Sequence, residues 1–363
     1  MKPQITRRTV LNGGLAAAAA LARPAIALGA SKVRYSLAWL PTGQYAYVYM
    51  ARQMGFWKKR GIEVDIIAGR GSAGAIQGVA GGTFEFSGPA MGANILSAIK
   101  GLPLQVVATH GYDVSLGVVV PGKGTMKTAK DLEGKTIGVV AGGGDTPFLS
   151  AYFGLAGVDD SKVTRVSLDA QLLEQALMSG RVDSILAFGM SSIPNFVSAD
   201  FPIRFMPFAS AGLQFYWVTT LTRSDFAKKN PQLVTDFQAG LAEGAKFMLL
   251  NPEETIERHL KEHDEIALSK NGKLFTELGV GMVSVCMNAL ESREHGLGYS
   301  DLGKVAAQAN LVKQYTAAPT DLDPPPVANY VTNAFLTPVT LTAEEWQGVA
   351  AKSHKYAALL GKA

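Results

Sequence analysis

Hydrophobic and polar positions follow two alternating patterns along the chain from Lys32 onward. Short apolar runs rich in β-branched and aromatic residues are typical of buried strands, whereas apolar residues spaced three or four apart are typical of helices. In the first third of the chain, strand patterns occupy residues 33–39, 61–69, 83–88 and 102–110, and helix patterns occupy residues 45–60, 72–82 and 92–101. This alternation predicts an α/β fold with a mainly parallel sheet that is covered by helices on both faces.

The alternation starts again after an apolar strand at residues 114–120. Strand patterns follow within 131–145 and at 162–168 and 181–189, with helix patterns at 146–157 and 170–180 between them. A short internal similarity links the two halves, because Gln77, Gly82 and Glu85 match Gln175, Gly180 and Asp183 at an offset of 98 residues. We therefore expect two lobes of similar construction rather than a repeat array.

The character of the sequence changes after a third alternating stretch at residues 201–223. Residues 225–317 are mostly helical in pattern, Pro324–Pro326 form a rigid segment, and a capping signal at residues 342–345 begins a last helix. The expected domains are a first part of lobe 1 at 31–113, lobe 2 at 114–216, and a return to lobe 1 with a helical C-terminal tail at 217–363.

Residues 1–30 have the features of an export signal. Arg7 and Arg8 precede an alanine-rich apolar stretch, and small residues end the segment. The arginine pair is typical of the twin-arginine type, and the apolar stretch is shorter than the about 20 residues that a membrane-spanning helix needs. We expect cleavage among residues 27–30 and a soluble periplasmic protein. The net charge of +4 is small, and Lys and Arg are scattered, so nothing indicates nucleic-acid binding.

The segment from Gly69 to Gly74 reads G-x-G-x-x-G, which is the dinucleotide-binding pattern. That pattern belongs after the first strand of its domain and needs an acidic residue about 20 positions later. Here it follows the second strand, and position 94 is Asn. We expect the glycines to present a helix N-terminus to a small ligand instead.

Other chemical motifs are incomplete. Residues 117–124 resemble a phosphate-binding loop, but Gly124 stands where Ser or Thr binds magnesium. His259 and His263 are four residues apart, and we interpret them as part of a solvated helix face. His110 either lines the cleft or makes a local hydrogen bond, and Cys286 is expected to be a buried core residue. We expect no catalytic residue, no metal and no cofactor.

Candidate ligand-binding residues lie in loops that follow the predicted strands, where ligands bind in open α/β sheets. Arg70 offers a charged fork for a carboxylate or sulfonate or is simply solvated, and Trp39 and Tyr45 either stack on a planar ring or pack in the core. The candidates are Trp39, Gln44, Tyr45, Arg70, Gly71, Ser72, Ser87, Gly143, Asp145, Thr146, Phe188, Tyr216 and Trp217.

Five segments, in order, resemble the periplasmic substrate-binding proteins of ABC importers, in the group that binds taurine, alkanesulfonates, nitrate and thiamine-pyrimidine precursors. The segments are YMARQMGFWKKRGIEVDI, VAGGTFEFSG, DLEGKTIGV, EQALMSGRVDSIL and NPQLVTDFQAGLAEGAKFMLLNPEE. The resemblance implies the type II periplasmic binding protein fold, with two lobes, two hinge crossovers, a ligand in the cleft and closure of the lobes. It also implies ligand contacts from Trp39, Tyr45, Gly71, Ser72, Ser87, Asp145, Thr146 and Trp217.

The sequence departs from this family after the strand that ends at Ala187, where Phe188 replaces a common acidic residue. This departure disfavours an amine-bearing ligand, and the aromatic first loop favours a planar solute such as a pyrimidine, an aromatic acid or a sulfonate. The expected partners are that solute and an inner-membrane permease, and the protein is expected to be a monomer. The alternatives are an enzyme of the same fold that makes the thiamine pyrimidine, or a ligand-sensing periplasmic protein. A single cysteine argues against the enzyme, whose relatives are expected to carry a cysteine-rich iron-binding segment.

Overall fold

The computed structural model describes residues 30–113, 115–140, 146–316 and 321–362, and its strands form two five-stranded sheets. The first sheet has the order β2-β1-β3-β10-β4, in which β10 is antiparallel to both of its neighbours and β1 is parallel to β2 and β3. Its strands are β1 (Ser31–Leu37), β2 (Ile62–Ile67), β3 (Phe86–Gly88), β4 (Leu104–Thr109) and β10 (Thr219–Arg223).

The second sheet has the equivalent order β7-β6-β8-β5-β9, in which only β5 is antiparallel to its neighbours. Its strands are β5 (Leu116–Pro121), β6 (Thr136–Val140), β7 (Thr164–Leu168), β8 (Ser184–Phe188) and β9 (Ile203–Pro207). In each sheet the antiparallel strand is the first strand after the chain crosses from the other sheet. The expected two-lobed fold with mainly parallel sheets and two crossovers is therefore confirmed.

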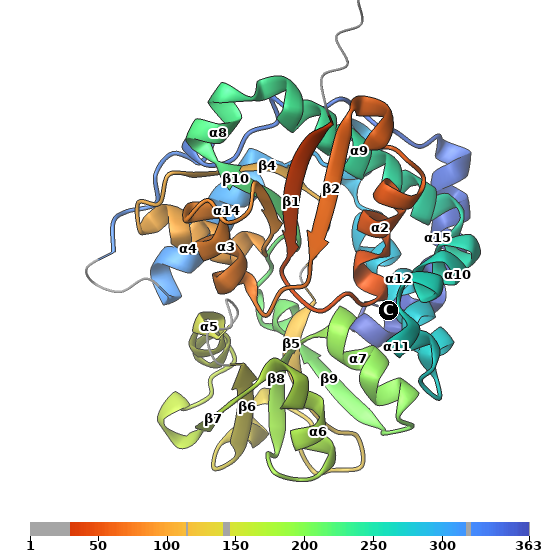
Figure 1. The fold of residues 1–363 in the computed structure, drawn as a ribbon. Helices are drawn as coiled ribbons and strands as arrows, with labels where there is room; N and C mark the ends of the chain where they lie inside the picture. The colour runs from red at the N-terminus through yellow and green to blue at the C-terminus, as the bar shows by residue number, and fades with distance from the viewer. Residues whose placement is uncertain (1–29, 114, 141–145, 317–320, 363) are drawn as a thin grey trace, which may run out of the picture.

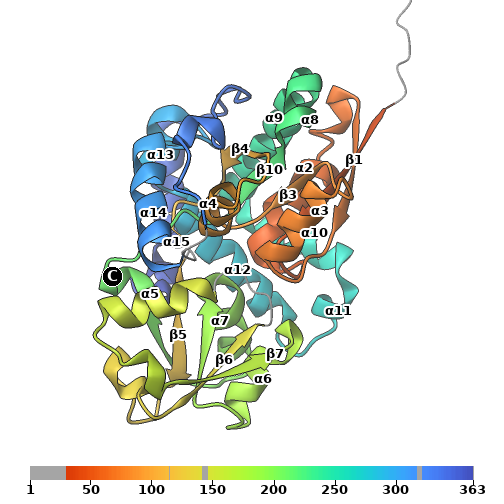
Figure 2. The ribbon, with the colours of Figure 1, turned by 90° about the vertical axis from the view of Figure 1, so that its left-hand side faces the viewer.

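Helices cover both faces of each sheet, and the two lobes lie one above the other (Figure 1). In the first lobe, α3 (Ser72–Ala80), α4 (Met91–Ile99) and α14 (Leu302–Tyr315) lie on one side, and α2 (Ala46–Gln53), α9 (Pro231–Leu250), α10 (Pro252–Glu262) and α12 (Gly272–Met287) lie on the other. The remaining helices of this lobe and the tail are α8 (Ser224–Lys229), α11 (Asp264–Ala267), α13 (Leu290–His295) and α15 (Ala343–Ala357). In the view of Figure 2, which is turned by 90°, α13 and α14 lie at the left of the molecule and β1 and α3 lie at the right.

The second lobe buries alternate residues of its strands on opposite faces. Val118 and Val120 belong to the same buried cluster as α5 (Pro147–Leu155), whereas Val119 packs with α6 (Leu173–Met178) and α7 (Gly189–Ser198). This alternation follows from the twofold side-chain period of a strand. None of the helices in the described part of the chain is long and apolar enough to cross a membrane.

The helix expected over residues 45–60 is shorter in the structure. It ends at Gln53, and Gly55 adopts a φ of 71°, a left-handed conformation that ends helices. Trp57 then turns inward, where its ring stacks on Phe237 at 5.1 Å and its Nε1 donates to the Phe237 carbonyl oxygen at 2.8 Å. A core aromatic contact thus decides where this element stops.

The internal similarity at an offset of 98 residues has a structural counterpart. The Glu85 carboxylate accepts a hydrogen bond from the backbone N–H of Arg34 in β1 at 2.8 Å, and the Asp183 carboxylate accepts one from the backbone N–H of Thr136 in β6 at 2.8 Å. These hydrogen bonds hold the pKa of Asp183 below its ordinary value. Each acid fixes the start of a strand onto the equivalent neighbouring strand of its sheet.

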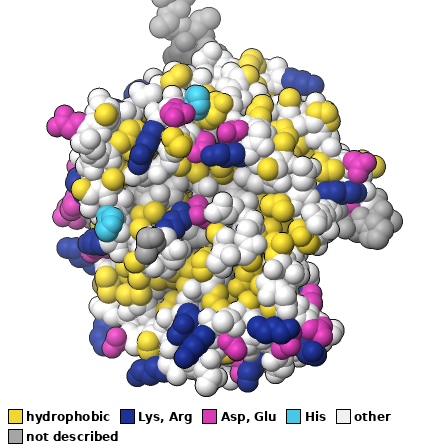
Figure 3. Space-filling view, turned by 180° about the vertical axis from the view of Figure 1, so that it is seen from behind, with side chains coloured by type: hydrophobic (Ala, Val, Ile, Leu, Met, Phe, Trp, Pro, Cys, Tyr) yellow, Lys and Arg dark blue, Asp and Glu magenta, His cyan; other side chains and the backbone are white. Residues whose placement is uncertain are grey.

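The two lobes also contact each other outside the crossovers. Phe148 of α5 packs against Gly92 of α4, and α7 packs along α12, where the Asn271 side chain donates to the Ser198 carbonyl oxygen. The C-terminal segment also reaches the second lobe, because the Lys362 ammonium lies 2.8 Å from the Asp113 carboxylate in the first crossover. Figure 3 shows hydrophobic side chains gathered across the middle of the rear face, between regions rich in charge.

Candidate functional site

The loop after β1 and the loop after β2 pack directly against each other. Gly71 donates its backbone N–H to the Ala38 carbonyl oxygen at 2.7 Å, and Gly69 donates to the Trp39 carbonyl oxygen at 3.0 Å. A Cβ on Gly69 would collide with the Leu37 carbonyl oxygen, and Gly71 has a φ of 129° that favours glycine. Gly69 and Gly71 are therefore required for close contact between the two loops and for the start of α3, whereas an added Cβ at Gly74 would meet nothing within 4 Å.

These two loops form one wall of a cavity of about 220 Å³ between the lobes. The opposite wall comes from the ends of β6 and β7 in the second lobe. Among the described residues, the lining consists of Leu40, Arg70, Val140, Leu168, Asp169, Ala170 and Gln171. Both walls are the carboxyl ends of parallel strands, which is the usual ligand position in open α/β sheets.

The cavity carries one cationic and one anionic side chain on opposite lobes. Arg70 is exposed and has no hydrogen bond or ion pair with any described residue, and Asp169 precedes a short helical turn at Ala170–Leu172. Because neither charge is paired with the other, both remain available to polar groups of a solute. Asp169 and Gln171 were missed by sequence reasoning, although their position directly after β7 satisfies the same strand-end rule that identified Arg70.

Three other sequence-predicted residues lie around this cavity or in the segments that form it. Trp39 is half-buried and packs against the buried clusters of both lobes, including the one that contains Val140 and Leu168. Ser72 begins α3, and its Oγ accepts the backbone N–H of Ala90 at 3.2 Å. Thr146 precedes α5, and its Oγ1 donates to the Val140 carbonyl oxygen at 3.4 Å. Gly143 and Asp145 lie outside the described residues.

Other candidates are buried in the first lobe. Gln44 and Tyr45 are each 2% exposed, and the Tyr45 ring lies 6.2 Å from the ring of Trp217, which is 3% exposed. Trp217 also packs on Gly111 and donates its backbone N–H to the carbonyl oxygen there. For Tyr45 and Trp217 the structure therefore shows core packing. Ser87 is fully buried, and its Oγ has no hydrogen-bond partner among the described residues.

Phe188 and Tyr216 lie apart from the lining of the cavity. Phe188 ends β8 half-buried, paired in register with Leu116. Tyr216 lines a different cavity beside the crossovers, where its hydroxyl donates to the Glu291 carboxylate at 2.5 Å and Glu291 also contacts the Lys304 ammonium at 2.7 Å. This geometry gives Tyr216 a structural hydrogen bond at the hinge.

The histidines differ from expectation in one respect. His110 is buried and makes a local hydrogen bond with Thr220 at 2.8 Å, which was one of its two interpretations. The interpretation of His259 and His263 as a solvated helix face is wrong, because they are 0% and 7% exposed and their rings lie 4.3 Å apart beneath α2. Exposed glutamates and lysines on the other side of α10 hid this buried stripe in the sequence. Cys286 is buried as expected, and burial raises its pKa to about 11.

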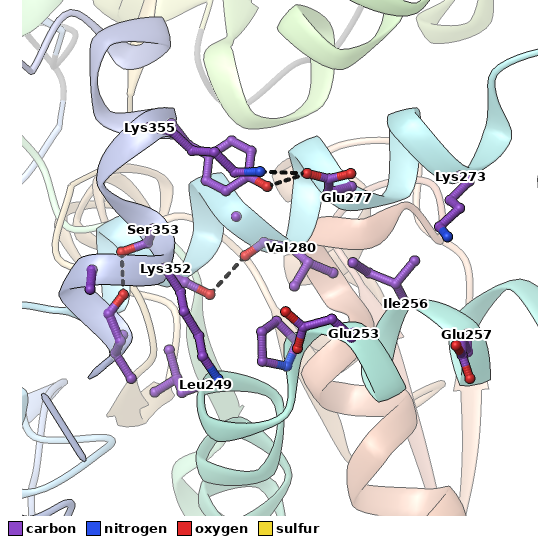
Figure 4. Close-up of a pocket in the computed structure, with 16 residues that line it drawn as sticks. Leu249, Glu253, Ile256, Glu257, Lys273, Glu277, Val280, Lys352, Ser353 and Lys355 are labelled. Carbon is purple, nitrogen blue, oxygen red and sulfur yellow. Dashed lines mark hydrogen bonds and ion pairs between the residues drawn. The ribbon is translucent and has the colours of Figure 1, made fainter. Parts of the chain in front are cut away.

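A larger groove of about 490 Å³ lies away from this cavity, between α10, α12 and α15 (Figure 4). Its charged groups include Glu277, whose carboxylate contacts the Lys355 ammonium at 2.8 Å and the Tyr356 hydroxyl at 2.6 Å. None of the sequence-predicted site residues lines it, and all of its elements belong to one side of the first lobe and the tail. The smaller cavity is the better candidate because both lobes and the strand ends form it.

A family model described as NMT1/THI5 like matches residues 42–255, which is more than half of the chain. The chain belongs to the NMT1/THI5-like family. This match contains the loop after β2 with Arg70, the whole second sheet and the return strand β10, so it includes lining residues from both walls of the cavity, whereas Leu40 precedes it.

The NMT1/THI5-like chain is similar both to a binding protein and to a synthase among curated proteins. It is 21% identical over 278 residues to a formylaminopyrimidine-binding protein of Halalkalibacterium halodurans, and this alignment covers 74% of this chain and 81% of the relative. It is also 21% identical over 241 residues to the 4-amino-5-hydroxymethyl-2-methylpyrimidine phosphate synthase THI13 of Saccharomyces cerevisiae, which covers 62% of this chain and 69% of the relative.

The fold of this family member matches solved binding proteins. The alkanesulfonate-binding protein SsuA from Xanthomonas axonopodis pv. citri, bound to MOPS, superimposes with a TM-score of 0.64 at 14% identity, covering 83% of this chain and 98% of that one. This likeness identifies the periplasmic binding protein fold.

Proposed function

We propose that this protein is the extracytoplasmic solute-binding component of an ABC importer, and that it captures a small organic solute between its lobes without changing it chemically. The observation that carries the proposal is the cavity whose opposite walls come from the strand ends of two separate lobes. Two chain crossovers allow such lobes to move apart and together, so that a solute enters and is then enclosed.

The proposed contacts combine charge with apolar surface. Arg70 on one wall and Asp169 on the other would receive polar groups of the solute, while Leu40, Val140 and Leu168 exclude water. Burial of most of the ligand surface with a few placed polar groups is how small-molecule sites reach affinity and specificity. A planar pyrimidine, an aromatic acid or a sulfonate fits this combination, and the similarity to pyrimidine- and sulfonate-binding proteins supports the same classes.

A thermal-shift panel on the mature protein tests the proposal, with formylaminopyrimidine, aromatic carboxylates, MOPS, taurine and nitrate as probes. A ligand that binds only the folded state adds about 2.7 kcal/mol of stability at a hundredfold excess over its Kd. We expect one class of probe to stabilise the wild type and Arg70→Gln to reduce that shift. Arg181→Gln is the matched control, because Arg181 is also an exposed arginine without an ion pair among the described residues and precedes β8 at the opposite end from the cavity. An equal loss in both variants, or no shift with any probe, would contradict the assignment of the cavity.

The synthase named among the relatives is the second candidate function. Binding and synthesis differ in the fate of the bound compound. We expect chromatography to recover the stabilising probe unchanged and in full after prolonged incubation with the protein. Conversion of the probe, or formation of a pyrimidine phosphate by the purified protein, would favour the enzyme.

A further inference from the structure

The first ligand loop, residues 38–45, rests on a buried histidine of α10. His259 is 0% exposed, and its Nε2 lies 3.2 Å from the carbonyl oxygen of Pro41 at the centre of this loop. A carbonyl oxygen only accepts hydrogen bonds, so Nε2 carries the proton and Nδ1 is the bare nitrogen of the neutral ring. Nδ1 is buried and has no hydrogen-bond partner among the described residues.

A second histidine and an aromatic ring enclose His259. The His263 ring lies 4.3 Å away, and the Tyr49 ring meets both histidines edge-on at 5.3 Å and 4.6 Å. The Nε2 of His263 is also buried and has no hydrogen-bond partner in the part of the chain that the structure describes, and its Nδ1 lies 3.5 Å from the carboxylate of the exposed Glu265. Tyr49 belongs to α2, which follows the ligand loop directly, so the loop and its helix rest together on this histidine pair.

The charged groups around the pair do not compensate a new positive charge at His259. On α2, Arg52 lies beside Tyr49 and pairs with Glu262 of α10. The positive charge of the Arg52 guanidinium disfavours a second positive charge on the nearby histidine pair. Glu265 of α11 faces His263 and not His259. On α12, Glu277 is engaged with Lys355 and Tyr356, and neither α9 nor α12 presents a hydrogen-bonding partner to the free nitrogen among the described residues. A second proton on His259 would therefore sit on Nδ1 without an acceptor.

Burial is the main reason why the pKa of His259 is lowered to about 3, the neighbouring His263 adds to the effect, and the hydrogen bond to the Pro41 carbonyl oxygen opposes it in part. Burial likewise lowers the pKa of His263, which Glu265 opposes in part. An exposed histidine titrates near about 6.5, so between that pH and the folded-state value the proton binds whichever state exposes the ring. Lifting of the loop from α10 is the local motion that would expose it.

We propose that His259 is the positioning residue of the first ligand loop, and that acid releases this loop from α10 and so weakens the capture of solute. The consequence for capture rests on the proposed function, whereas the release of the loop does not. Trp39 and Leu40 lie in the same loop as Pro41, and Leu40 lines the cavity, so detachment at Pro41 displaces Leu40 from one wall of the site.

Amide hydrogen exchange of the ligand-free protein between pH 7.5 and pH 5.0 tests the release directly. After correction for the intrinsic exchange rate, we expect residues 40–49 of the wild type to exchange faster below pH 6.5, by at most about tenfold per pH unit for one proton. His259→Gln retains an N–H donor of similar reach but does not titrate, so its loop should remain equally protected across the range. His354→Gln is the matched control, because His354 is exposed on α15 and should leave the wild-type profile unchanged.

Loop exchange that does not depend on pH in the wild type would overturn the proposal. This measurement does not require any variant to fold. The same acceleration in His259→Gln would also overturn it. Titration with formylaminopyrimidine then measures the effect on capture. We expect its Kd to rise below pH 6.5 in the wild type, by at most about tenfold per pH unit, and to change less in His259→Gln. Loop release without any binding at pH 7.5 would support the role of His259 and count against a pyrimidine ligand in the proposed function.

Discussion

A methyl group added at Gly92 should hold the two lobes apart. Gly92 lies in the first turn of α4, and an added Cβ would lie 2.6 Å from Cζ and 3.0 Å from Cε2 of Phe148 in the other lobe. Carbon atoms in contact normally lie about 3.5–4.0 Å apart. Phe148 is 3% exposed and its ring lies 4.7 Å from that of Phe215, so it has little room to retreat.

We take the described arrangement of the lobes, in which Gly92 lies against Phe148, as the closed form, so that the overlap raises the free energy of that form alone. Overpacking of a buried contact costs about 1–3 kcal/mol. The gain of about 0.5–1 kcal/mol from replacing glycine by alanine inside a helix applies to open and closed forms alike, so it cancels in binding. Gly92→Ala should therefore weaken ligand affinity by about 5- to 150-fold while the ligand-free protein melts at or above the wild-type temperature.

The assay is a calorimetric titration with the strongest probe of the panel, together with the radius of gyration of the ligand-free protein from small-angle scattering. Gly154→Ala is the matched control, because Gly154 is also helical, lies in α5, and has nothing within 4 Å of an added Cβ. Combining Gly92→Ala with Phe148→Leu should restore part of the affinity by shortening the opposing side chain. If Gly92→Ala and Gly154→Ala bind equally well and have equal radii, the contact between Gly92 and Phe148 does not control closure.

Three further outcomes concern the core and its titrating groups. Trp57→Ala should cost about 3–5 kcal/mol of unfolding free energy in urea denaturation, because it removes a large buried ring that stacks on Phe237 and donates to the Phe237 carbonyl oxygen. A loss below about 1 kcal/mol would contradict this packing. Burial raises the pKa of the Cys286 thiol to about 11, so this thiol should react with a thiol reagent at pH 8 only after denaturation. Rapid stoichiometric labelling of the native protein would refute its burial. Burial lowers the pKa of His259 to about 3, so the contribution of the neutral His259 ring to the free energy of unfolding is complete above about pH 6.5. Below that pH the contribution is lost by about 1.4 kcal/mol per pH unit. Urea midpoints that are flat from pH 6.5 to 5.0, or that fall equally in His259→Gln, would refute this linkage.

Local sequence signals predicted the strands and helices that form the walls of the cavity. The turn glycines at Gly82 and Gly180 adopt φ values of 75° and 74°, as their matched positions in the repeat suggested. Strand-end reasoning also placed Arg70 at the cavity, and it would have found Asp169 if the end of β7 had been treated like the others. These features were predictable because backbone conformation and strand ends depend on nearby residues.

The side-chain roles were harder to predict because they depend on the partner surface. Tyr45 was a candidate either for ring stacking on a ligand or for core packing, and Trp217 was a candidate ligand contact, but each covers the other inside the first lobe. Tyr216 was assigned to the same site, but its hydroxyl donates to Glu291, 75 residues further along the chain. An aromatic residue at a strand end looks the same in the sequence whether it faces a cleft or a helix from a distant segment.

The sequence by itself determined the alternation of strands and helices, the division into two similar lobes and the glycine-dependent turns, because these follow from hydrophobic period and local backbone preference. Only the tertiary structure decided which side chains meet. His259 lies 218 residues from Pro41 in the chain, and it became a buried support of the first ligand loop when α10 folded against α2. A local pattern determines which face of an element is apolar, whereas the packing of the whole chain determines which segment covers that face.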